Sequence, residues 1–126
     1  MTGVQATVDV LIVDDERDMR ALLRMLIDEA NHGLKVVGEA EDGVGALQQW
    51  REQKPTVIVL DNRMPGMTGL EIAEEILRHE PGQPIVLFTA YADRVTVATA
   101  ASLGVRCLAK TDLSRIPESI WAAAGP

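Results

Sequence analysis

The chain has 126 residues and a formal net charge of -7, with Asp and Glu spread along its length. This length suits one domain with one core, and the negative charge argues against a face that binds nucleic-acid phosphates. The single cysteine, Cys107, can form no internal disulfide, and the first residues lack both a basic start and a long apolar run. We therefore expect a cytoplasmic chain that neither crosses a membrane nor binds nucleic acid directly.

Five short apolar runs have the length of strands that are buried on both faces, as the strands of parallel sheets are. They cover residues 8–13, 34–37, 57–60, 85–88 and 105–108. Segments of helical period lie between and after them, at 19–30, 44–50, 70–77, 94–101 and, behind Pro117, 118–124. The fourth of these is the weakest, because its β-branched residues lower helix propensity and tertiary packing must hold it.

The alternation of strands and helices predicts parallel strands joined by right-handed crossovers, with helices on both faces of one sheet. We therefore expect a doubly wound α/β fold. In such sheets ligands bind beyond the carboxyl ends of the strands. The residues that follow each strand are thus the candidates for function.

Charged and hydroxyl side chains follow four of the predicted strands: Asp14 and Asp15, Asp61, Thr89, and Lys110. Three ionised carboxylates in a partly dehydrated pocket repel one another and so predict a divalent cation. Hard oxygen ligands favour Mg²⁺, or Mn²⁺ in its place. A metal on carboxylates beside a Lys and a Thr suits phosphoryl transfer, with Asp61 as the nucleophile.

Taken together, these motifs resemble the receiver domain of two-component response regulators, chemotaxis receivers among them. The matching residues are Asp14 and Asp15 in LIVDDE, Asp61 in VLDNRMPGMTG, Thr89 with Ala90, and Lys110. The resemblance covers about residues 8–124 and implies a five-stranded, flavodoxin-like sheet in the order 2-1-3-4-5. Each residue alone has an ordinary explanation, such as a helix cap or a surface amine. Their joint placement at successive strand ends favours the site.

The resemblance implies that Asp61 attacks a phosphohistidine of a histidine kinase or phosphotransfer protein and becomes an acyl phosphate. It implies Mg²⁺ on the carboxylates of Asp15 and Asp61 and on the backbone carbonyl of Arg63, with Asp14 holding a coordinated water. Lys110 would neutralise the transferring oxygens. His32 and His79 lie away from every strand end, so the phosphodonor histidine is expected on another protein.

The resemblance also implies a switch. Thr89, which precedes Ala90, would turn its hydroxyl onto the new phosphoryl group and draw the fourth strand and helix after it. The face made by the fourth helix, fifth strand and fifth helix would then change for an output domain or an effector. Phosphorylation-linked homodimers are a further expectation.

Two positions depart from the family, and two variable positions carry bulky residues. Cys107 stands where an aromatic residue usually rotates with the Thr, so we expect repacking of residues 94–103 to carry the outer half of the switch. Thr111 stands where proline is common, which leaves a cis or a trans bond before it open. We predict that Arg63 and Tyr91 restrict water and lengthen the phosphorylated lifetime.

Three other classes compete with this interpretation. A pseudo-receiver that docks a partner without phosphorylation gains from Cys107 and Thr111 but loses because every acidic position is intact. A phosphohydrolase would need a general acid at Arg63, which cannot serve. A flavin or nucleotide site lacks its Gly-rich loop, since DDERDM follows the first strand.

We therefore expect residues 1–126 to form one receiver domain without an output domain, a switch that catalyses its own phosphorylation and dephosphorylation. The sequence leaves open whether the chain acts alone or belongs to a longer regulator. It also leaves open the kinase, the effector and the oligomeric state.

Overall fold

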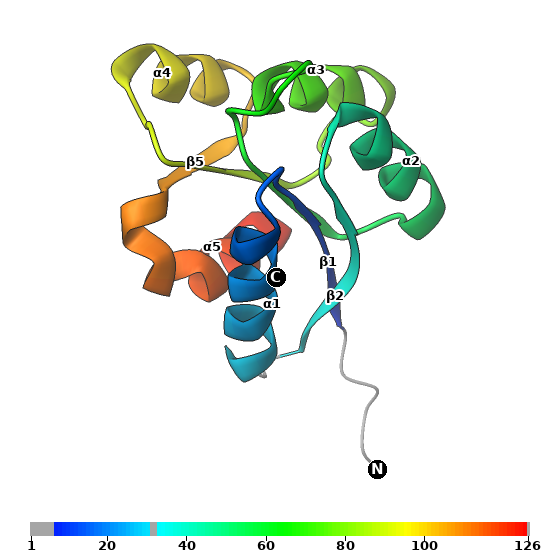
Figure 1. Ribbon diagram of the computed structural model, residues 1–126. Coiled ribbons are helices and arrows are strands. Elements are labelled where there is room, and N and C mark those ends of the chain that lie inside the picture. The colour runs from blue at the N-terminus through cyan, green and yellow to red at the C-terminus, as the bar shows by residue number, and fades with distance from the viewer. Residues whose placement is uncertain (1–6, 31–32, 126) are drawn as a thin grey trace.

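The computed structural model describes residues 7–30 and 33–125, so His32 lies outside the described residues (Figure 1). Five strands form one parallel sheet: β1 (Val8–Val13), β2 (Leu34–Ala40), β3 (Val57–Leu60), β4 (Ile85–Thr89) and β5 (Arg106–Ala109). Their order, β2-β1-β3-β4-β5, confirms the doubly wound, flavodoxin-like sheet. The helices are α1 (Arg17–Ala30), α2 (Gly43–Gln53), α3 (Gly69–His79), α4 (Arg94–Ser102), the 3-10 helix η1 (Lys110–Arg115) and α5 (Ile116–Ala124).

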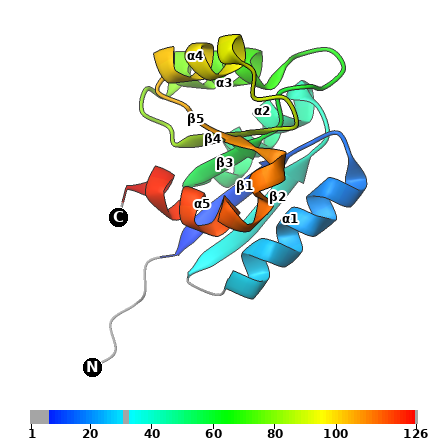
Figure 2. The ribbon, with the colours of Figure 1, turned by 90° about the vertical axis from the view of Figure 1, so that its left-hand side faces the viewer.

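The sheet lies between two layers of helices, with α1 and α5 on one face and α2, α3 and α4 on the other (Figures 1 and 2). Neighbouring strand residues serve opposite cores. Leu11 and Val13 pack with α2, α3 and α4, whereas Val10 and Ile12 pack with α1 and α5. Burial on both faces explains why the central strand β3 is apolar at each of its positions and why β1 and β4 contain runs of consecutive apolar residues.

Short polar side chains begin the helices as the sequence predicts. The side chain of Asp42 accepts a hydrogen bond from the backbone of Gly45 at the start of α2, and Thr68 forms a capping box with Glu71 at the start of α3. Asp93 caps the β-branched helix α4 by accepting from the Thr96 backbone at 2.8 Å. The helix expected there is therefore confirmed.

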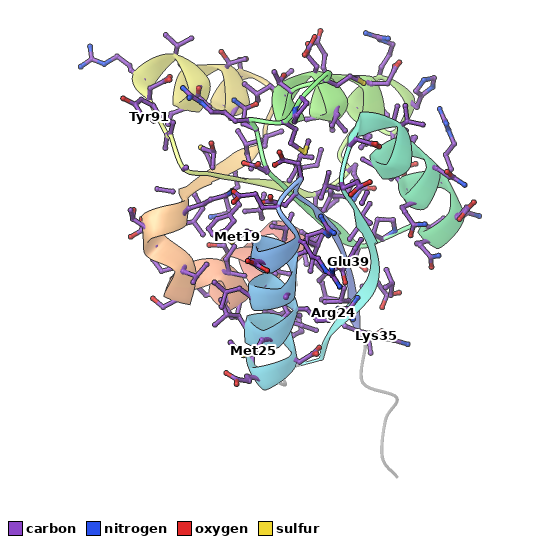
Figure 3. The ribbon with its side chains drawn as sticks, in the orientation of Figure 1. Met19, Arg24, Met25, Lys35, Glu39 and Tyr91 are labelled. Atoms are coloured by element: carbon purple, nitrogen blue, oxygen red, sulfur yellow. The ribbon has the colours of Figure 1, made fainter. Side chains whose placement is uncertain are left out.

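The structure differs from the prediction at β2 and after β5. β2 continues past residue 37 to Ala40, because pairing with β1 resumes after a register shift and holds Glu39 at a sheet edge. This extension brings Glu39 to Arg24 of α1 (Figure 3). The helix η1 was not predicted, since one short 3-10 segment gives no apolar period. Thr111 follows a trans peptide bond, since the described residues contain no cis bond.

Within residues 7–30 and 33–125, every helix is too short or too polar to cross a bilayer.

Candidate functional site

The site lies where β1 and β3 end side by side. Val13 pairs with Leu60 in the parallel register, and the backbone N–H of Asp61 donates to the Val13 carbonyl at 2.9 Å. Asp14 and Asp61, the next residues of the two strands, are therefore neighbours. Parallel pairing thus produces the convergence of carboxylates that the sequence indicates.

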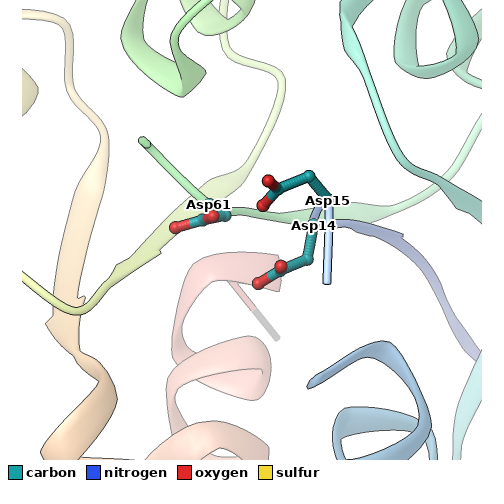
Figure 4. Close-up of side chains that lie close together, drawn as sticks. All are labelled: Asp14, Asp15 and Asp61. Atoms are coloured by element: carbon teal, nitrogen blue, oxygen red, sulfur yellow. The ribbon is translucent and has the colours of Figure 1, made fainter. Parts of the chain in front are cut away.

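Three carboxylates gather at this edge (Figure 4). Asp14, Asp15 and Asp61 each offer an oxygen within 4.8 Å of the others. Asp14 is completely buried and Asp61 is 4% exposed, whereas Asp15 is exposed to solvent. The cluster is therefore closed toward the core and open toward water at Asp15.

One cation compensates the two buried carboxylates. Lys110 Nζ lies 2.9 Å from Oδ2 of Asp14 and 3.3 Å from Oδ1 of Asp61, and it stands 5.9 Å from the centre of the Phe88 ring. Burial opposes the charged amine, but the hydrogen bond to Asp14 and the charge of Asp61 outweigh it and raise the pKa of Lys110. Lys110 is therefore a positive charge held at the carboxylates of Asp14 and Asp61.

Asp61 is the carboxylate whose titration the fold changes most clearly. Burial, followed by the charge of Asp14, raises its pKa from 3.8 to about 6, although Lys110 opposes this shift. The ionised carboxylate is thus held in surroundings that destabilise it. A cation or an electrophile bound to the Asp61 carboxylate would reduce this unfavourable electrostatic energy.

Thr89 ends β4 and is completely buried. Its hydroxyl oxygen accepts a hydrogen bond from the backbone N–H of Tyr91 at 3.3 Å, across the exposed Ala90. The hydrogen bonds of the described residues include none between Thr89 and Asp61. The structure therefore brings Thr89 to the edge of the sheet but does not join it to Asp61.

Arg63 and Tyr91 meet beside the site. The Arg63 guanidinium lies 4.8 Å from the centre of the Tyr91 ring. Tyr91 is 60% exposed, on the segment that leads to α4 (Figure 3). Hydrogen bonds from Thr96, and after them the charge of Arg63, lower the pKa of Asp93 at the start of α4. The loop after β3 and the start of α4 are thus linked by attraction.

Cys107 lies half-buried on β5 and packs against the core beneath α2, α3 and α4. Burial, and then the charge of Asp93, raises the pKa of the thiol. Cys107 therefore has the position of a small apolar packing residue, and its raised pKa keeps the thiol in its unreactive protonated form.

Sequence reasoning missed the residues that hold the loop between Asp61 and α3. Asn62 accepts a hydrogen bond from the Leu70 backbone on its side chain, at 3.0 Å, and from the Gly69 backbone on its carbonyl, at 2.9 Å. A Cβ at Gly69 would collide with the backbone carbonyl of Asp61. A helix that starts directly against Asp61 requires this glycine, and the only signal in the sequence was a Gly after a capping Thr.

Comparison with known proteins identifies the family. The family model described as the response regulator receiver domain matches residues 10–120. Chemotaxis protein CheY of Thermotoga maritima is 35% identical over 97 residues, which cover 77% of this chain and 79% of CheY. A protein-glutamate methylesterase/protein-glutamine glutaminase of Hahella chejuensis is 41% identical over 98 residues, but these span 76% of this chain and only 28% of that protein.

A solved structure has the same fold. Response regulator TrrA of Thermotoga maritima, crystallised in complex with Mg²⁺ and BeF, superposes with a TM-score of 0.79 at 28% identity, covering 91% of this chain and 97% of that one. The fold and the acidic edge define a receiver module of two-component signalling. The chain belongs to the response regulator receiver domain family.

The donor set fits a hard divalent cation. Three carboxylates within 4.8 Å offer only oxygen atoms, as Mg²⁺ prefers. The exposed position of Asp15 leaves room for the water and phosphate oxygens that Mg²⁺ keeps in its shell.

Proposed function

We propose that Asp61 accepts a phosphoryl group from a phosphohistidine of a histidine kinase or phosphotransfer protein. The observation that carries this proposal is the position of Asp61, which is 4% exposed, lies beside the other two carboxylates and has Lys110 Nζ at 3.3 Å. A carboxylate oxygen forms the new bond to phosphorus. The bond from phosphorus to the donor imidazole breaks, and its electron pair stays on that nitrogen.

The ligands proposed for Mg²⁺ are the side chains of Asp15 and Asp61 and the backbone carbonyl of Arg63, with Asp14 holding a coordinated water. When bound, Mg²⁺ neutralises charge on the phosphoryl oxygens. Lys110 would neutralise the same charge, because its three donors can follow the phosphoryl group from the phosphohistidine to Asp61.

Loss of the phosphoryl group is proposed to occur in the same site. Water attacks the phosphorus of the acyl phosphate, the bond to the Asp61 oxygen breaks, and inorganic phosphate leaves. Arg63 and Tyr91 are proposed to slow this step, since their stacked side chains lie beside the acceptor loop and restrict the approach of water.

The output is proposed to be a changed surface. The Thr89 hydroxyl, which accepts from the Tyr91 backbone N–H, would turn and donate its proton to the phosphoryl group. Helix α4 would repack, because Cys107 provides no rotating aromatic ring. The α4, β5 and α5 face would then bind an output domain, an effector or a second copy. We assign the receiver unit to about residues 8–124 and its compartment to the cytoplasm, which agrees with the free thiol of Cys107.

The experiment is incubation with Mg²⁺ and acetyl phosphate, followed by intact mass measurement of the wild type and of Asp61→Ala. A gain of one phosphoryl group by the wild type alone is expected. No gain in either protein contradicts the proposal and favours a pseudo-receiver. Release of phosphate from unrelated phosphoesters favours a hydrolase instead.

A further inference from the structure

A partly buried arginine joins α1 to the acidic edge. The Arg20 side chain is only 15% exposed, and its terminal nitrogen donates to the backbone carbonyl of Asp14 at 2.8 Å. Its Nε donates to Glu39, at the end of β2, at 3.3 Å. The same Glu39 carboxylate pairs with Arg24 at 2.6 Å, where both side chains are more exposed (Figure 3). Arg20 therefore braces the end of β1 against β2.

This contact completes the set of bonds around Asp14. The Asp14 N–H donates to Ala40 at 3.0 Å, and the two carboxylate oxygens accept from the Glu16 backbone at 2.8 Å and from Lys110 at 2.9 Å. Only the carbonyl depends on Arg20. That carbonyl belongs to the peptide group that leads to Asp15, so its orientation sets the direction of the next side chain.

We propose that Arg20 is a positioning residue for the acidic cluster: by holding the Asp14 carbonyl, it aims the exposed Asp15 carboxylate toward Asp61. This inference rests on the proposed cation site. Burial limits the conformations of Asp14 and Asp61, but Asp15 is exposed and depends on its backbone for its direction. A planar guanidinium suits the task, because it can donate to the carbonyl and to Glu39 at once, which an ammonium cannot do in the same geometry.

The charge of Arg20 predicts the opposite effect from its position. A guanidinium 2.8 Å from the Asp14 carbonyl repels an incoming cation, so removal of the charge alone would tighten Mg²⁺ binding. Removal of the brace would weaken it, because an outer residue that orients a metal ligand typically contributes about tenfold or more to affinity. The sign of the change therefore separates the two roles.

The test is calorimetric titration of Mg²⁺ into the wild type, Arg20→Met and the matched control Arg24→Met. Arg20→Met is expected to bind Mg²⁺ about tenfold more weakly. Its phosphorylation by acetyl phosphate should recover at saturating Mg²⁺, which marks a loss of affinity rather than of chemistry. Arg24→Met should match the wild type. Unchanged or tighter binding by folded Arg20→Met overturns the proposal.

A second measurement needs neither metal nor phosphate. The Glu16 backbone N–H, which donates to Asp14, should exchange with solvent about fivefold faster in metal-free Arg20→Met and at the wild-type rate in Arg24→Met. Equal exchange rates of this N–H in the wild type, Arg20→Met and Arg24→Met would reject the positioning role of Arg20, even if the wild type is phosphorylated. Faster exchange in Arg20→Met, together with a wild type that acetyl phosphate does not phosphorylate, would support the positioning role of Arg20 and reject the proposed function.

A third variant serves if Arg20→Met does not fold. Glu39→Gln retains Arg20 and an acceptor oxygen but removes the charge that orients the guanidinium. Glu39→Gln is expected to weaken Mg²⁺ binding and to speed exchange of the Glu16 N–H, both by less than Arg20→Met does. Wild-type affinity together with a wild-type exchange rate in Glu39→Gln would then reject the proposal.

Discussion

Lys110 and Asp14 stand 96 residues apart in the chain, and their charged atoms lie 2.9 Å apart in the structure. The same ammonium reaches Asp61, so one cation joins the ends of β1, β3 and β5. Desolvated carboxylates without such a partner are strongly unfavourable. The contact therefore serves the stability of the fold as well as the proposed chemistry.

The first prediction concerns the loss of this cation. Lys110→Met should lower the free energy of unfolding by about 2–4 kcal/mol in metal-free buffer at pH 7, because Asp14 and Asp61 stay buried without their partner. The raised pKa of Lys110 means that its contribution is complete below its ordinary pKa of 10.5 and is lost only as the pH climbs through the raised value.

Urea denaturation measures this difference, and Arg115→Met is the control. Arg115 pairs with Glu118 at the surface, where the two side chains are 61% and 67% exposed. The urea midpoint of Arg115→Met should therefore stay at the wild-type value. Equal midpoints for Lys110→Met and Arg115→Met would show that the buried pair contributes nothing.

The second prediction concerns the charge of Asp61. Its pKa is 3.8 ordinarily and about 6 in the fold, so the folded protein binds this proton more tightly than the unfolded chain does. Stability from this group therefore falls as the pH rises between these two values. In metal-free buffer at pH 7, Asp61→Asn should be more stable than the wild type by about 1–3 kcal/mol, and at pH 4 the two should converge.

Thermal or urea unfolding across this pH range checks the prediction. Asp93→Asn is a useful contrast, because hydrogen bonds from Thr96 lower the pKa of Asp93 and its charge stabilises the fold above the ordinary value. Its removal should act in the opposite direction at neutral pH. Parallel curves for the wild type and Asp61→Asn would contradict the assigned environment of Asp61.

The third prediction concerns the close approach of α3 to Asp61. Gly69→Ala should destabilise the protein by about 2–3 kcal/mol, because the new methyl group meets the backbone carbonyl of Asp61, which cannot move alone. Gly43, also the first residue of its helix, is the matched control. A methyl group there meets the side chain of Met67, with Sδ at 2.8 Å, and that flexible chain can shift. Equal urea midpoints for the two variants would contradict this.

Convergence at the site was predictable because it depends on topology alone. The carboxyl ends of parallel strands share one edge of the sheet. The positions of the apolar runs were therefore enough to predict that Asp14, Asp61 and Lys110 lie close together. No knowledge of side-chain packing was required. The direction and the partner of each side chain depend on packing, which the structure shows.

The supporting contacts were not predictable in this way. Arg20 meets Glu39 only because β2 continues past its apolar residues after a register shift against β1, and a strand pattern does not encode such a shift. The hydrogen bond between the Asn62 side chain and the Leu70 backbone likewise depends on the path of the loop between β3 and α3. Contacts between polar groups of different elements depend on angstrom-scale registration, which hydrophobic periodicity leaves undetermined.

The fourth prediction concerns α4, which buries only Thr96 and Ala100 and carries exposed Val95 and Val97. Few buried contacts make an element open readily. Amide exchange in residues 94–103 should change on phosphorylation, while that of α3 stays nearly constant. Mass spectrometry of exchanged peptides, with and without acetyl phosphate, gives both values. Unchanged protection in residues 94–103 would remove α4 from the switch.

The last prediction concerns the stacked pair beside the acceptor and rests on the proposed phosphorylation. An exposed cation-π contact is worth about 0.5–1 kcal/mol, so Tyr91→Ala should shorten the phosphorylated lifetime by about two- to fivefold. Arg63→Ala should have a similar effect, and the double variant should add little, because either change breaks the same contact. Tyr91→Phe keeps the ring and should keep the lifetime. Decay of the phosphorylated mass measures each rate, and a wild-type rate in Tyr91→Ala would show that water reaches the acyl phosphate by a path that this pair does not cover.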